Sequence, residues 1–339
     1  MRSIFVFAAL IGVCRCRNRF NAQHPILASA KSPIDQPLLG FGTWNLRESG
    51  DNTSDAVAIA MEAGYRQIDC ATAYGNEKYV GKGIAKGLEK TGLNREDIWV
   101  TSKLWNDHHG EYARVEEGLN KTLKDLNLEY LDLYLMHWPV GKGPDQEKYH
   151  YDYVETWKSM AKLLSTHRVR HIGISNFSPS QLHHLLSQTM QKPSAHQMEL
   201  HPYLPQTDWI RFHQAHGISI TAYSPLGNMN PTYGDRARRS PATRSNTPLL
   251  LENETVGKIA EARGCTPAQV VLAWGMGRAT SVIPKSKHES HIRENFGSLK
   301  CVLEVEDWED LETLGEEPTR FNNPSKAWGV DLFEGLDDA

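Results

Sequence analysis

Ionisable and polar side chains occur at the ends of most of the strands that the sequence predicts. Asp69 offers a carboxylate, Tyr74 a phenol, Lys103 an ammonium and His137 an imidazole. Groups of these types can transfer protons when a fold brings them together. Further polar side chains follow the later predicted strands, at Ser175, Asn176, Gln197, Glu199, Tyr223, Ser224, Lys285 and Ser286. We therefore expect an enzyme whose site is assembled from many strand ends.

The elements that must position these residues alternate along the chain. The near-continuous apolar run 131–137 is typical of a buried parallel strand, and 112–126 has helical spacing. Strands are predicted at 38–43, 65–69, 98–102, 131–137, 168–175, 194–199, 218–223 and 281–283. Helical patterns lie at 55–63, 77–90, 112–126, 153–164, 179–188, 208–216, 266–274 and 288–299.

This alternation determines the expected fold class. A strand followed by a helix about every 30 residues predicts a parallel sheet. Eight such units favour an α/β fold closed as a single-domain (β/α)8 TIM barrel, with an open doubly wound sheet as the alternative. A barrel of this kind carries its active site at the carboxyl ends of its strands, which is where the polar residues occur.

Three segments are expected along the 339 residues. Residues 1–35 form an atypical N-terminal extension, 36–318 form the barrel, and 319–339 form a tail over the active site. The length equals about two average domains, but single barrels reach this size, and no linker-like stretch divides the chain. The irregular stretch 227–247 is expected to be either a functional loop or a disordered one.

The N-terminal segment allows three interpretations. The apolar run 3–13 fits the hydrophobic region of a signal peptide and is too short to span a membrane. Four arginines and no acidic residue precede Asp35, which is typical of a mitochondrial presequence. The third interpretation is an untypical start on a cytoplasmic enzyme. Between 23 and 37 no hairpin pattern is seen that could close the bottom of a barrel.

Composition excludes several classes of function. The chain has 37 basic and 41 acidic residues, and its net charge of −4 offers no basic field for nucleic acid. Five cysteines are few and odd in number, so no disulfide framework is expected. The pairs His108-His109 and His183-His184 have side chains that point apart, so no metal site is expected.

One glycine-rich segment imitates a dinucleotide-binding loop. In GKGIAKG, residues 81–87, the third glycine comes one residue late, and the segment lies inside a helical pattern. We interpret it as a helix surface of low helix propensity.

Eight segments together resemble the aldo-keto reductase family. They are GFGTW (40–44), GYRQIDCATAYGNE (64–77), TSKLW (101–105), LYLMHWP (133–139), GISNFS (173–178), HQMELHPYL (196–204), TAYSPLG (221–227) and VIPKS (282–286). They follow the family order from about Leu38 to Asn295. The resemblance implies a (β/α)8 barrel that reduces an aldehyde or ketone with NADPH, without metal or flavin.

The resemblance also assigns four catalytic residues. Tyr74 matches the proton donor, Lys103 the ammonium beside it, Asp69 the paired carboxylate and His137 the histidine that orients the substrate carbonyl. A free phenol has a pKa of about 10, and an adjacent ammonium is expected to lower it. Each residue alone has a structural alternative, such as a strand cap, a surface charge, a packed loop aromatic or a core histidine. Their joint occurrence favours catalysis.

Cofactor contacts are implied in the same way. The nicotinamide end is assigned to Ser175, Asn176, Gln197 and Tyr223. Further matches to cofactor contacts are Gly42, Thr43, Trp44, Ser224, Leu226, Asn228, Lys285, Ser286, His291, Glu294 and Asn295.

One of these positions departs from the family. His291 stands where the family usually has an arginine for the 2′-phosphate, and Arg293 is an offset substitute. Histidine is mostly neutral at pH 7, so a weaker or more pH-dependent preference for NADPH is expected, with NADH as the second cofactor.

The substrate is expected to be a small carbonyl compound derived from a polyol or sugar. The resemblance implies a pocket lined by Trp44, Trp105, His137, Trp138 and the tail residue Trp328, with Phe333 as the alternative tail contact. The tail resembles those of fungal-type members that act on glyceraldehyde, glycerol or sugar-acid aldehydes. A non-catalytic NADPH-binding regulatory or structural protein of the same fold is the alternative function.

Partners and compartment follow from the same interpretation. We expect no nucleic-acid or membrane partner, and a monomer, with a dimer as the alternative. The sequence Asn176-Phe177-Ser178 is a formal glycosylation site, but Asn176 is expected to face the cofactor. This argues for the cytoplasm over secretion, with mitochondria as a further alternative.

Overall fold

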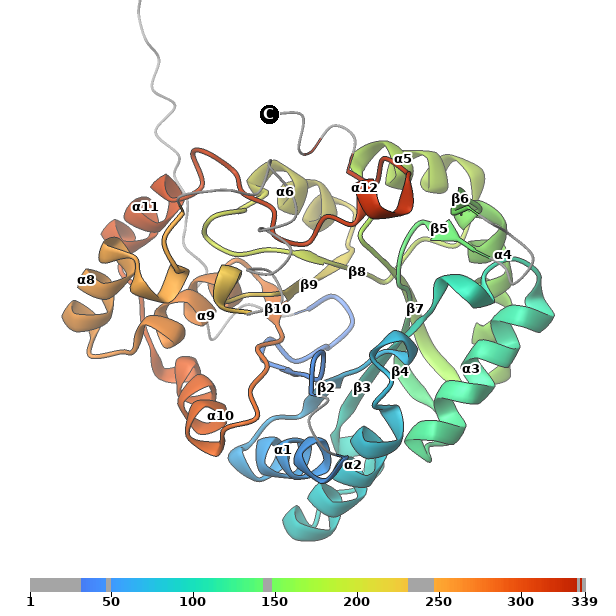
Figure 1. Cartoon of the computed structure of the whole chain (residues 1–339), viewed down its shortest axis with the longest axis horizontal. Coiled ribbons are helices and arrows are strands. Elements are labelled where there is room, and N and C mark those ends of the chain that lie inside the picture. Colours follow the sequence, from blue (N-terminus) through green and yellow to red (C-terminus); the bar gives the residue numbers. More distant parts are fainter. Residues whose placement is uncertain (1–31, 47–49, 143–147, 231–246, 334–335, 337–339) are drawn as a thin grey trace, which may run out of the picture.

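Eight parallel strands form the centre of the molecule (Figure 1). The computed structural model describes residues 32–46, 50–142, 148–230, 247–333 and 336. The strands are hydrogen-bonded in the order β1 (Phe41–Gly42), β2 (Gln67–Asp69), β3 (Trp99–Leu104), β4 (Leu131–Met136), β7 (Val169–Ser175), β8 (Ala195–Glu199), β9 (Ser219–Tyr223) and β10 (Thr280–Val282). All eight predicted strands are confirmed.

The sheet closes on itself between its first and last strands. Leu39 forms a parallel bridge with Val282. The amide of Gly40 donates to the carbonyl of Val282 (2.9 Å), and the amide of Val282 donates to that of Leu38 (2.8 Å). These bonds make the sheet a barrel, so the (β/α)8 prediction is confirmed and the open-sheet alternative is wrong.

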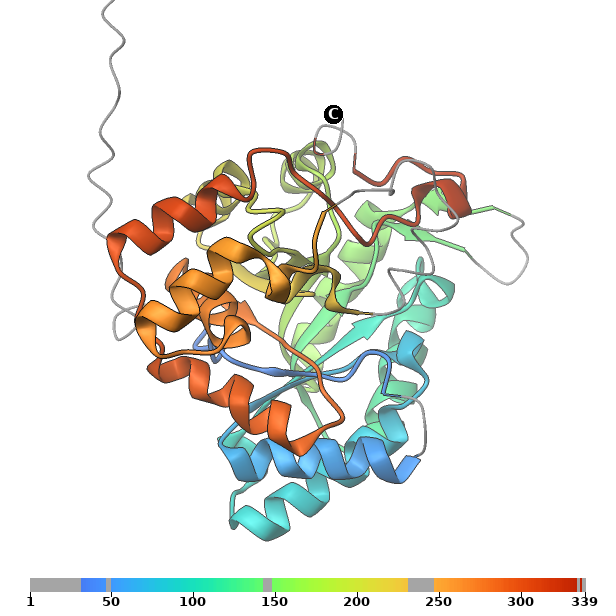
Figure 2. The same cartoon turned by 60° about the vertical axis from the view of Figure 1, so that its left-hand side comes forward.

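Helices surround the barrel (Figures 1 and 2). They are α1 (Gly50–Ala63), α2 (Glu77–Thr91), α3 (Tyr112–Leu126), α4 (Tyr153–Leu163), α5 (Pro179–Gln188), α6 (Thr207–Ala215), α8 (Glu254–Arg263), α9 (Pro267–Gly277), α10 (Glu289–Phe296), α11 (Val305–Thr313) and α12 (Ser325–Trp328). The sequence patterns missed α8, α11 and α12. They also missed the hairpin of β5 (Val140–Gly141) and β6 (His150–Tyr151).

Capping residues fix the starts of two helices that follow strands. The Ser178 hydroxyl accepts from the amide of Gln181 at the start of α5, and Pro179 occupies the first turn. Thr266 does the same for Gln269 at the start of α9. Both starts follow from sequence chemistry alone.

A single extended segment covers the amino-terminal end of the barrel. Ile34 packs with Trp99 against a small cluster inside the barrel, formed by Leu133, Leu135 and Ala195. The Gln36 amide donates to the Thr221 hydroxyl (2.9 Å). Residues 23–31, where no hairpin was predicted, lie outside the described residues.

The glycines of α2 have a packing role that the sequence interpretation missed. Gly81, Gly83 and Gly87 are buried, so they are not a helix surface of low propensity. A Cβ on Gly83 would lie 2.7 Å from both the carbonyl oxygen of Ser54 and the Cβ of Val57 in α1. The absence of side chains therefore lets α1 and α2 pack closely.

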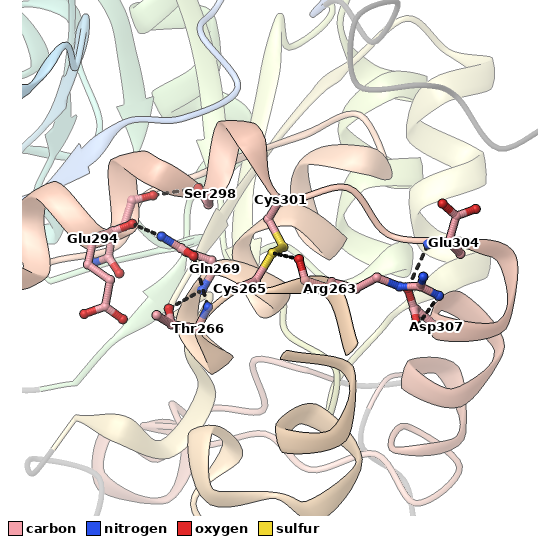
Figure 3. Close-up of a disulfide and its surroundings, with 10 residues drawn as sticks. Arg263, Cys265, Thr266, Gln269, Glu294, Ser298, Cys301, Glu304 and Asp307 are labelled. Carbon is pink, nitrogen blue, oxygen red and sulfur yellow. Dashed lines mark hydrogen bonds and ion pairs between the residues drawn. A yellow bond between two sulfur atoms is a disulfide. The ribbon is translucent and has the colours of Figure 1, made fainter. Parts of the chain in front are cut away.

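Two of the five cysteines form a disulfide, which the sequence analysis did not expect. Cys265, between α8 and α9, is bonded to Cys301, which follows α10 (Figure 3). A separation of 36 residues hides this pair in the sequence, and only helix packing brings the two together. The Gln269 amide joins the same two segments by donating to the carbonyl of Glu294 (2.9 Å).

Two further expectations concern absences. Among the described residues, no cluster of histidine, cysteine, aspartate and glutamate side chains is suited to hold a metal ion. No helix in the described part of the chain is long and apolar enough to cross a membrane.

A pair of glycine substitutions tests the close packing of α1 and α2. Gly83→Ala should lower the free energy of unfolding by about 1–3 kcal/mol, because its methyl group overpacks against backbone. Gly257→Ala in α8 is the matched control, since its Cβ would meet nothing within 4 Å. That change should instead stabilise the protein by about 0.5–1 kcal/mol. Urea unfolding of both variants is the measurement, and equal stabilities would contradict the packing argument.

Candidate active site

A buried ammonium joins three of the predicted catalytic residues. Lys103, in β3, is fully buried. Its Nζ donates to Oδ1 of Asp69 at the end of β2 (2.6 Å), to the carbonyl of Cys70 (2.9 Å) and to the hydroxyl of Tyr74 (3.2 Å). Because an ammonium has three donors, all of them are satisfied. Asp69, Tyr74 and Lys103 are therefore brought together at one point, at the carboxyl ends of β2 and β3.

Lys103 keeps its positive charge because its hydrogen-bond partners offset the cost of burying the ammonium. Burial by itself would lower the pKa of Lys103, but the charge and hydrogen bond of Asp69, together with Tyr74 and Cys70, outweigh this effect and raise it. The second carboxylate oxygen of Asp69 accepts from the Gln197 amide (2.8 Å). Lys103 therefore remains an ammonium at neutral pH.

The phenol of Tyr74 titrates differently from the sequence expectation. Burial raises the pKa of Tyr74 to about 12, and the nearby charge of Lys103 only limits the increase. The expectation of a lowered value is wrong because desolvation of the phenolate exceeds the stabilisation by the ammonium. Tyr74 therefore carries its proton at neutral pH and can donate it.

Glu77 fixes the turn that carries Tyr74, a role that the sequence analysis missed. Tyr74 lies in a short 3-10 turn (Thr72–Tyr74) just before α2. The buried Glu77 carboxylate accepts from Ser102 in β3 (2.7 Å) and from Thr72 in this turn (3.2 Å). Glu77 thus ties the phenol's turn to the strand of Lys103. The sequence signal for this role is the position of Glu77 at the end of the segment YGNE, which begins with Tyr74.

His137 lies between the charged group and a wall of aromatic rings. Its ring contacts Tyr74 edge-on at 5.8 Å and Trp105 at 5.1 Å between centroids. Burial, the Lys103 charge and His109 hold the pKa of His137 well below its usual range. The imidazole is therefore neutral. Its Nδ1 is buried and has no hydrogen-bond partner among the described residues.

The C-terminal tail contributes to this aromatic wall. Trp328 of α12 contacts Trp105 at 6.1 Å and Trp138 at 5.0 Å, and Phe333 contacts Trp138 at 6.1 Å. Tyr149, which no sequence signal indicated, stacks on Trp328 at 4.6 Å. Figures 1 and 2 show α12 beside the hairpin β5–β6. Trp44 lies half-buried in the turn after β1.

Buried hydrogen bonds hold the tail across the barrel. The Glu199 carboxylate at the end of β8 accepts from the amides of Phe321 (2.7 Å) and Asn322 (2.8 Å). His201 donates to the same carboxylate (2.9 Å). Burial would raise the pKa of Glu199, but bonds from His201 and Phe321 and the charge of Arg320 lower it overall. The carboxylate is ionised and acts as the anchor of the tail.

Four predicted cofactor residues form a second group, beside the charged one. The Asn176 amide donates to the carbonyl of His137 (3.0 Å) and to the Ser175 hydroxyl (3.1 Å), and its oxygen accepts from Tyr223 (2.7 Å). Gln197 reaches Asp69. Asn176 and Ser224 both have a left-handed backbone, with φ of 61° and 47°. Such strain in non-glycine residues is concentrated at functional sites.

A cavity of about 470 Å³ opens next to the ends of β1, β9 and β10. Six predicted cofactor residues line it: Leu226, Lys285, Ser286, His291, Glu294 and Asn295. The sequence analysis missed other lining residues, among them Asn45, Asn52, Lys287 and His288. Arg293 does not line it and pairs with Glu289 on the exposed side of α10. Among the described residues, therefore, no arginine substitutes for His291 in the cavity wall.

The remaining predicted cofactor residues lie at the barrel rim. The Gly42 amide donates to the carbonyl of Pro284 (3.0 Å), and the Thr43 hydroxyl donates to that of Asp69 (2.9 Å). The side chain of Asn228 has a structural role. Its amide nitrogen donates to the carbonyl of Pro248, and its amide oxygen accepts from the backbone amide of Leu250. It thereby anchors residues 248–250. Most of the long loop, 231–246, lies outside the described residues.

The donor set fits a nicotinamide dinucleotide. Cationic and hydroxyl groups in the cavity, led by Lys285 and Ser286, suit a phosphorylated adenosine. Amides and a tyrosine ring near the Asp69–Lys103–Tyr74 group suit a carboxamide-bearing aromatic ring. The two regions are adjacent, because Leu226 lines the cavity and follows Tyr223 closely in sequence. A long dinucleotide can therefore extend from the cavity to the catalytic group.

The chain is similar to known proteins over most of its length. The sequence profile of the Aldo/keto reductase family matches residues 38–316. An uncharacterized oxidoreductase of Schizosaccharomyces pombe is 44% identical over 315 residues, which cover 89% of this chain and 92% of the relative. An NAD(P)H-dependent D-xylose reductase of Candida tropicalis is 38% identical over 319 residues, covering 89% and 96%. The solved structure of a Bombyx mori aldo-keto reductase in complex with NADP superposes with a TM-score of 0.79, at 31% identity and covering 88% and 95%.

Fold, site and relatives agree on the class of protein. A (β/α)8 barrel with these neighbours is an oxidoreductase that reduces carbonyl compounds with NAD(P)H. The chain belongs to the aldo-keto reductase family. The resemblance seen in the sequence is thereby confirmed.

The tail anchor gives a prediction for proteolysis. Glu199→Gln should speed tryptic cleavage after Arg320 or Lys326 about tenfold, because an amide nitrogen then faces one of the tail N–H groups. Glu254→Gln is the control, since Glu254 is exposed and pairs only with Lys258. Mass spectrometry of timed digests measures both rates. Tail cleavage at the wild-type rate in Glu199→Gln would show that the carboxylate does not anchor the tail.

Proposed function

We propose that the protein reduces small aldehydes or ketones derived from polyols or sugars to alcohols, with Tyr74 as the proton donor. The observation that carries the proposal is the contact of the Lys103 ammonium with both Tyr74 and Asp69. NADPH, when bound, supplies the hydride. Every other requirement of the reaction falls to side chains of this chain.

The mechanism follows from the charges of the group. Neutral His137 orients the substrate by a hydrogen bond to the carbonyl oxygen. That oxygen becomes an alkoxide during reduction and takes the Tyr74 proton. Lys103 stabilises the phenolate that remains, and Asp69 keeps the lysine charged and in place. Because the pKa of Tyr74 is about 12, the donor is protonated over the whole neutral range.

The predicted cofactor contacts are part of the same proposal. Ser175, Asn176 and Gln197 bind the carboxamide of the nicotinamide, and its ring stacks on Tyr223. Gly42, Thr43, Trp44, Ser224, Leu226 and Asn228 border the path toward the cavity. Lys285, Ser286, His291, Glu294 and Asn295 bind the phosphorylated adenosine, which their positions around the cavity support.

Substrate selection is assigned to the aromatic wall. Trp44, Trp105, Trp138 and Trp328, with His137, leave room for a small and partly polar carbonyl compound. A relative is named as a reductase of D-xylose, which is a small sugar aldehyde. We propose that residues 319–339 form a tail over the barrel formed by 36–318, which the ring contacts of Trp328 support.

Glycosylation of Asn176 in the folded protein is incompatible with this site. Asn176 is 3% exposed, and both its amide nitrogen and its oxygen are hydrogen-bonded in the site. A glycan on this side chain would break those bonds, so we propose a cytoplasmic enzyme over a secreted one.

Tyr74→Phe tests the proposed proton donor. The variant should bind NADPH as the wild type does but lose about 10²- to 10⁴-fold in kcat for an aldehyde such as D-glyceraldehyde. Tyr203→Phe is the control, because the Tyr203 hydroxyl bonds only Asn253 outside the catalytic group. Steady-state kinetics and cofactor titration supply the measurements. Near-normal turnover by Tyr74→Phe would contradict the assignment and show that another group donates the proton, whereas no turnover by the wild type would favour the non-catalytic alternative.

His291→Arg tests the cofactor preference. Arginine binds phosphate with two parallel hydrogen bonds and is always charged, so the ratio of kcat/KM for NADPH over NADH should rise about tenfold. Arg293→Gln should leave the ratio unchanged, since Arg293 does not line the cavity. An unaltered ratio in His291→Arg would mean that position 291 does not determine the preference.

A further inference from the structure

Two buried histidines form a relay of hydrogen bonds behind the cofactor residue Asn176. The amide of Phe177 donates to Nε2 of His196 (3.2 Å). Nδ1 of His196 lies 2.7 Å from Nε2 of His213 in α6. Nδ1 of His213 lies 2.6 Å from the carbonyl oxygen of Trp209. Both imidazoles are completely buried.

The ends of this relay determine where its protons are. A backbone carbonyl can only accept, so His213 carries its proton on Nδ1 and accepts at Nε2. A backbone amide can only donate, so His196 accepts at Nε2 and donates from Nδ1. Every bond is then satisfied with one proton on each ring. A second proton on either ring would place two donors against each other, so both rings are neutral.

The relay acts on the backbone that holds Asn176. Asn176 has a left-handed backbone, and its own amide donates to the carbonyl of Gln197 (3.0 Å) in β8. The next amide, that of Phe177, finds no strand carbonyl and is bound by the His196 ring. Two successive amides after β7 are thus fixed to β8. This fixes the direction in which the Asn176 side chain reaches His137, Ser175 and Tyr223.

Strand alternation gives His196 this position. Gln197 points into the barrel, where it meets Asp69, so its neighbour His196 points outward toward α6. The surroundings there are aromatic, with Phe177 and Trp209 edge-on to the ring. An apolar side chain would pack there and leave the Phe177 amide unpaired. A hydrogen-bonding ring at this site is therefore explained by the amide, not by packing.

We propose that His196 and His213 are positioning residues that hold the Asn176 turn in the geometry needed at the nicotinamide end of the cofactor site. This rests on the proposed function, because it takes Asn176 as a nicotinamide contact. The pair does not touch substrate or cofactor. Loss of the pair should therefore weaken binding of the nicotinamide end of the dinucleotide and leave binding of the other end unchanged.

His196→Leu is the test. Binding of NADP⁺ should weaken about tenfold, because without the His196 bond the turn leaves the binding geometry in the free protein and must be restored to it when the cofactor binds. Binding of adenosine 2′,5′-bisphosphate, which lacks the nicotinamide end, should stay within about twofold of the wild type. Hydrogen exchange of the segment 175–178 in the free protein should rise. Fluorescence titration and mass spectrometry provide these readouts without any turnover.

Two further variants separate positioning from general loss of structure. His196→Gln retains an acceptor for the Phe177 amide and should restore much of the NADP⁺ affinity. Trp157→Phe removes a different buried bond, from Trp157 to the carbonyl of Gln191 (2.8 Å), and should lower stability without changing NADP⁺ affinity. The double variant His196→Leu/His213→Leu should lose no more affinity than His196→Leu alone, because the two rings act in series.

The outcomes distinguish this proposal from the function on which it rests. Equal losses for NADP⁺ and the bisphosphate in His196→Leu, or unchanged exchange at 175–178, would overturn the positioning role. A wild-type protein that binds neither ligand would overturn the proposed cofactor site itself. In that case, increased exchange in His196→Leu would still establish the relay as a brace of this turn, but not as a cofactor device.

Discussion

The buried ion pair between Lys103 and Asp69 is the constraint around which the barrel's carboxyl end is built. An ammonium without water needs a partner for each of its three donors, and the chain supplies a carboxylate, a carbonyl and a phenol. Each comes from the loop and strand end next to Lys103 in the sheet. The pair therefore fixes where Tyr74 lies, and the surrounding residues must fix Asp69 in turn. Gln197, from the opposite side of the barrel, does so.

The same rule governs other buried polar residues around this group. Glu77, Glu199 and His196 are all buried, and each holds a backbone segment or turn. A buried polar side chain costs stability unless its bonds are made, so each one specifies a single local geometry. As a result, Tyr74, the tail and Asn176 are each held in one position.

Residue types and spacing were enough to predict the eight strands and which residues meet at the strand ends. Those features depend on local chemistry and on the periodicity of parallel strands. The misses depend on contacts between distant segments. Gly83 and Gly87 of α2 face the α1 surface, Cys265 meets Cys301 only through helix packing, and Glu199 meets the tail across more than 120 residues. The pKa of Tyr74 was misjudged because a sequence shows the neighbouring charge but not the degree of burial.

Gln197 and Asn176 connect the two halves of the site. Gln197 bonds the catalytic carboxylate while its backbone carbonyl accepts from the amide of Asn176. Asn176 in turn bonds the carbonyl of His137. Any displacement of the Asn176 turn would therefore also displace His137 and Asp69. Such coupling explains why the chain holds this turn at both ends, by the strand β8 on one side and by a neutral histidine pair on the other.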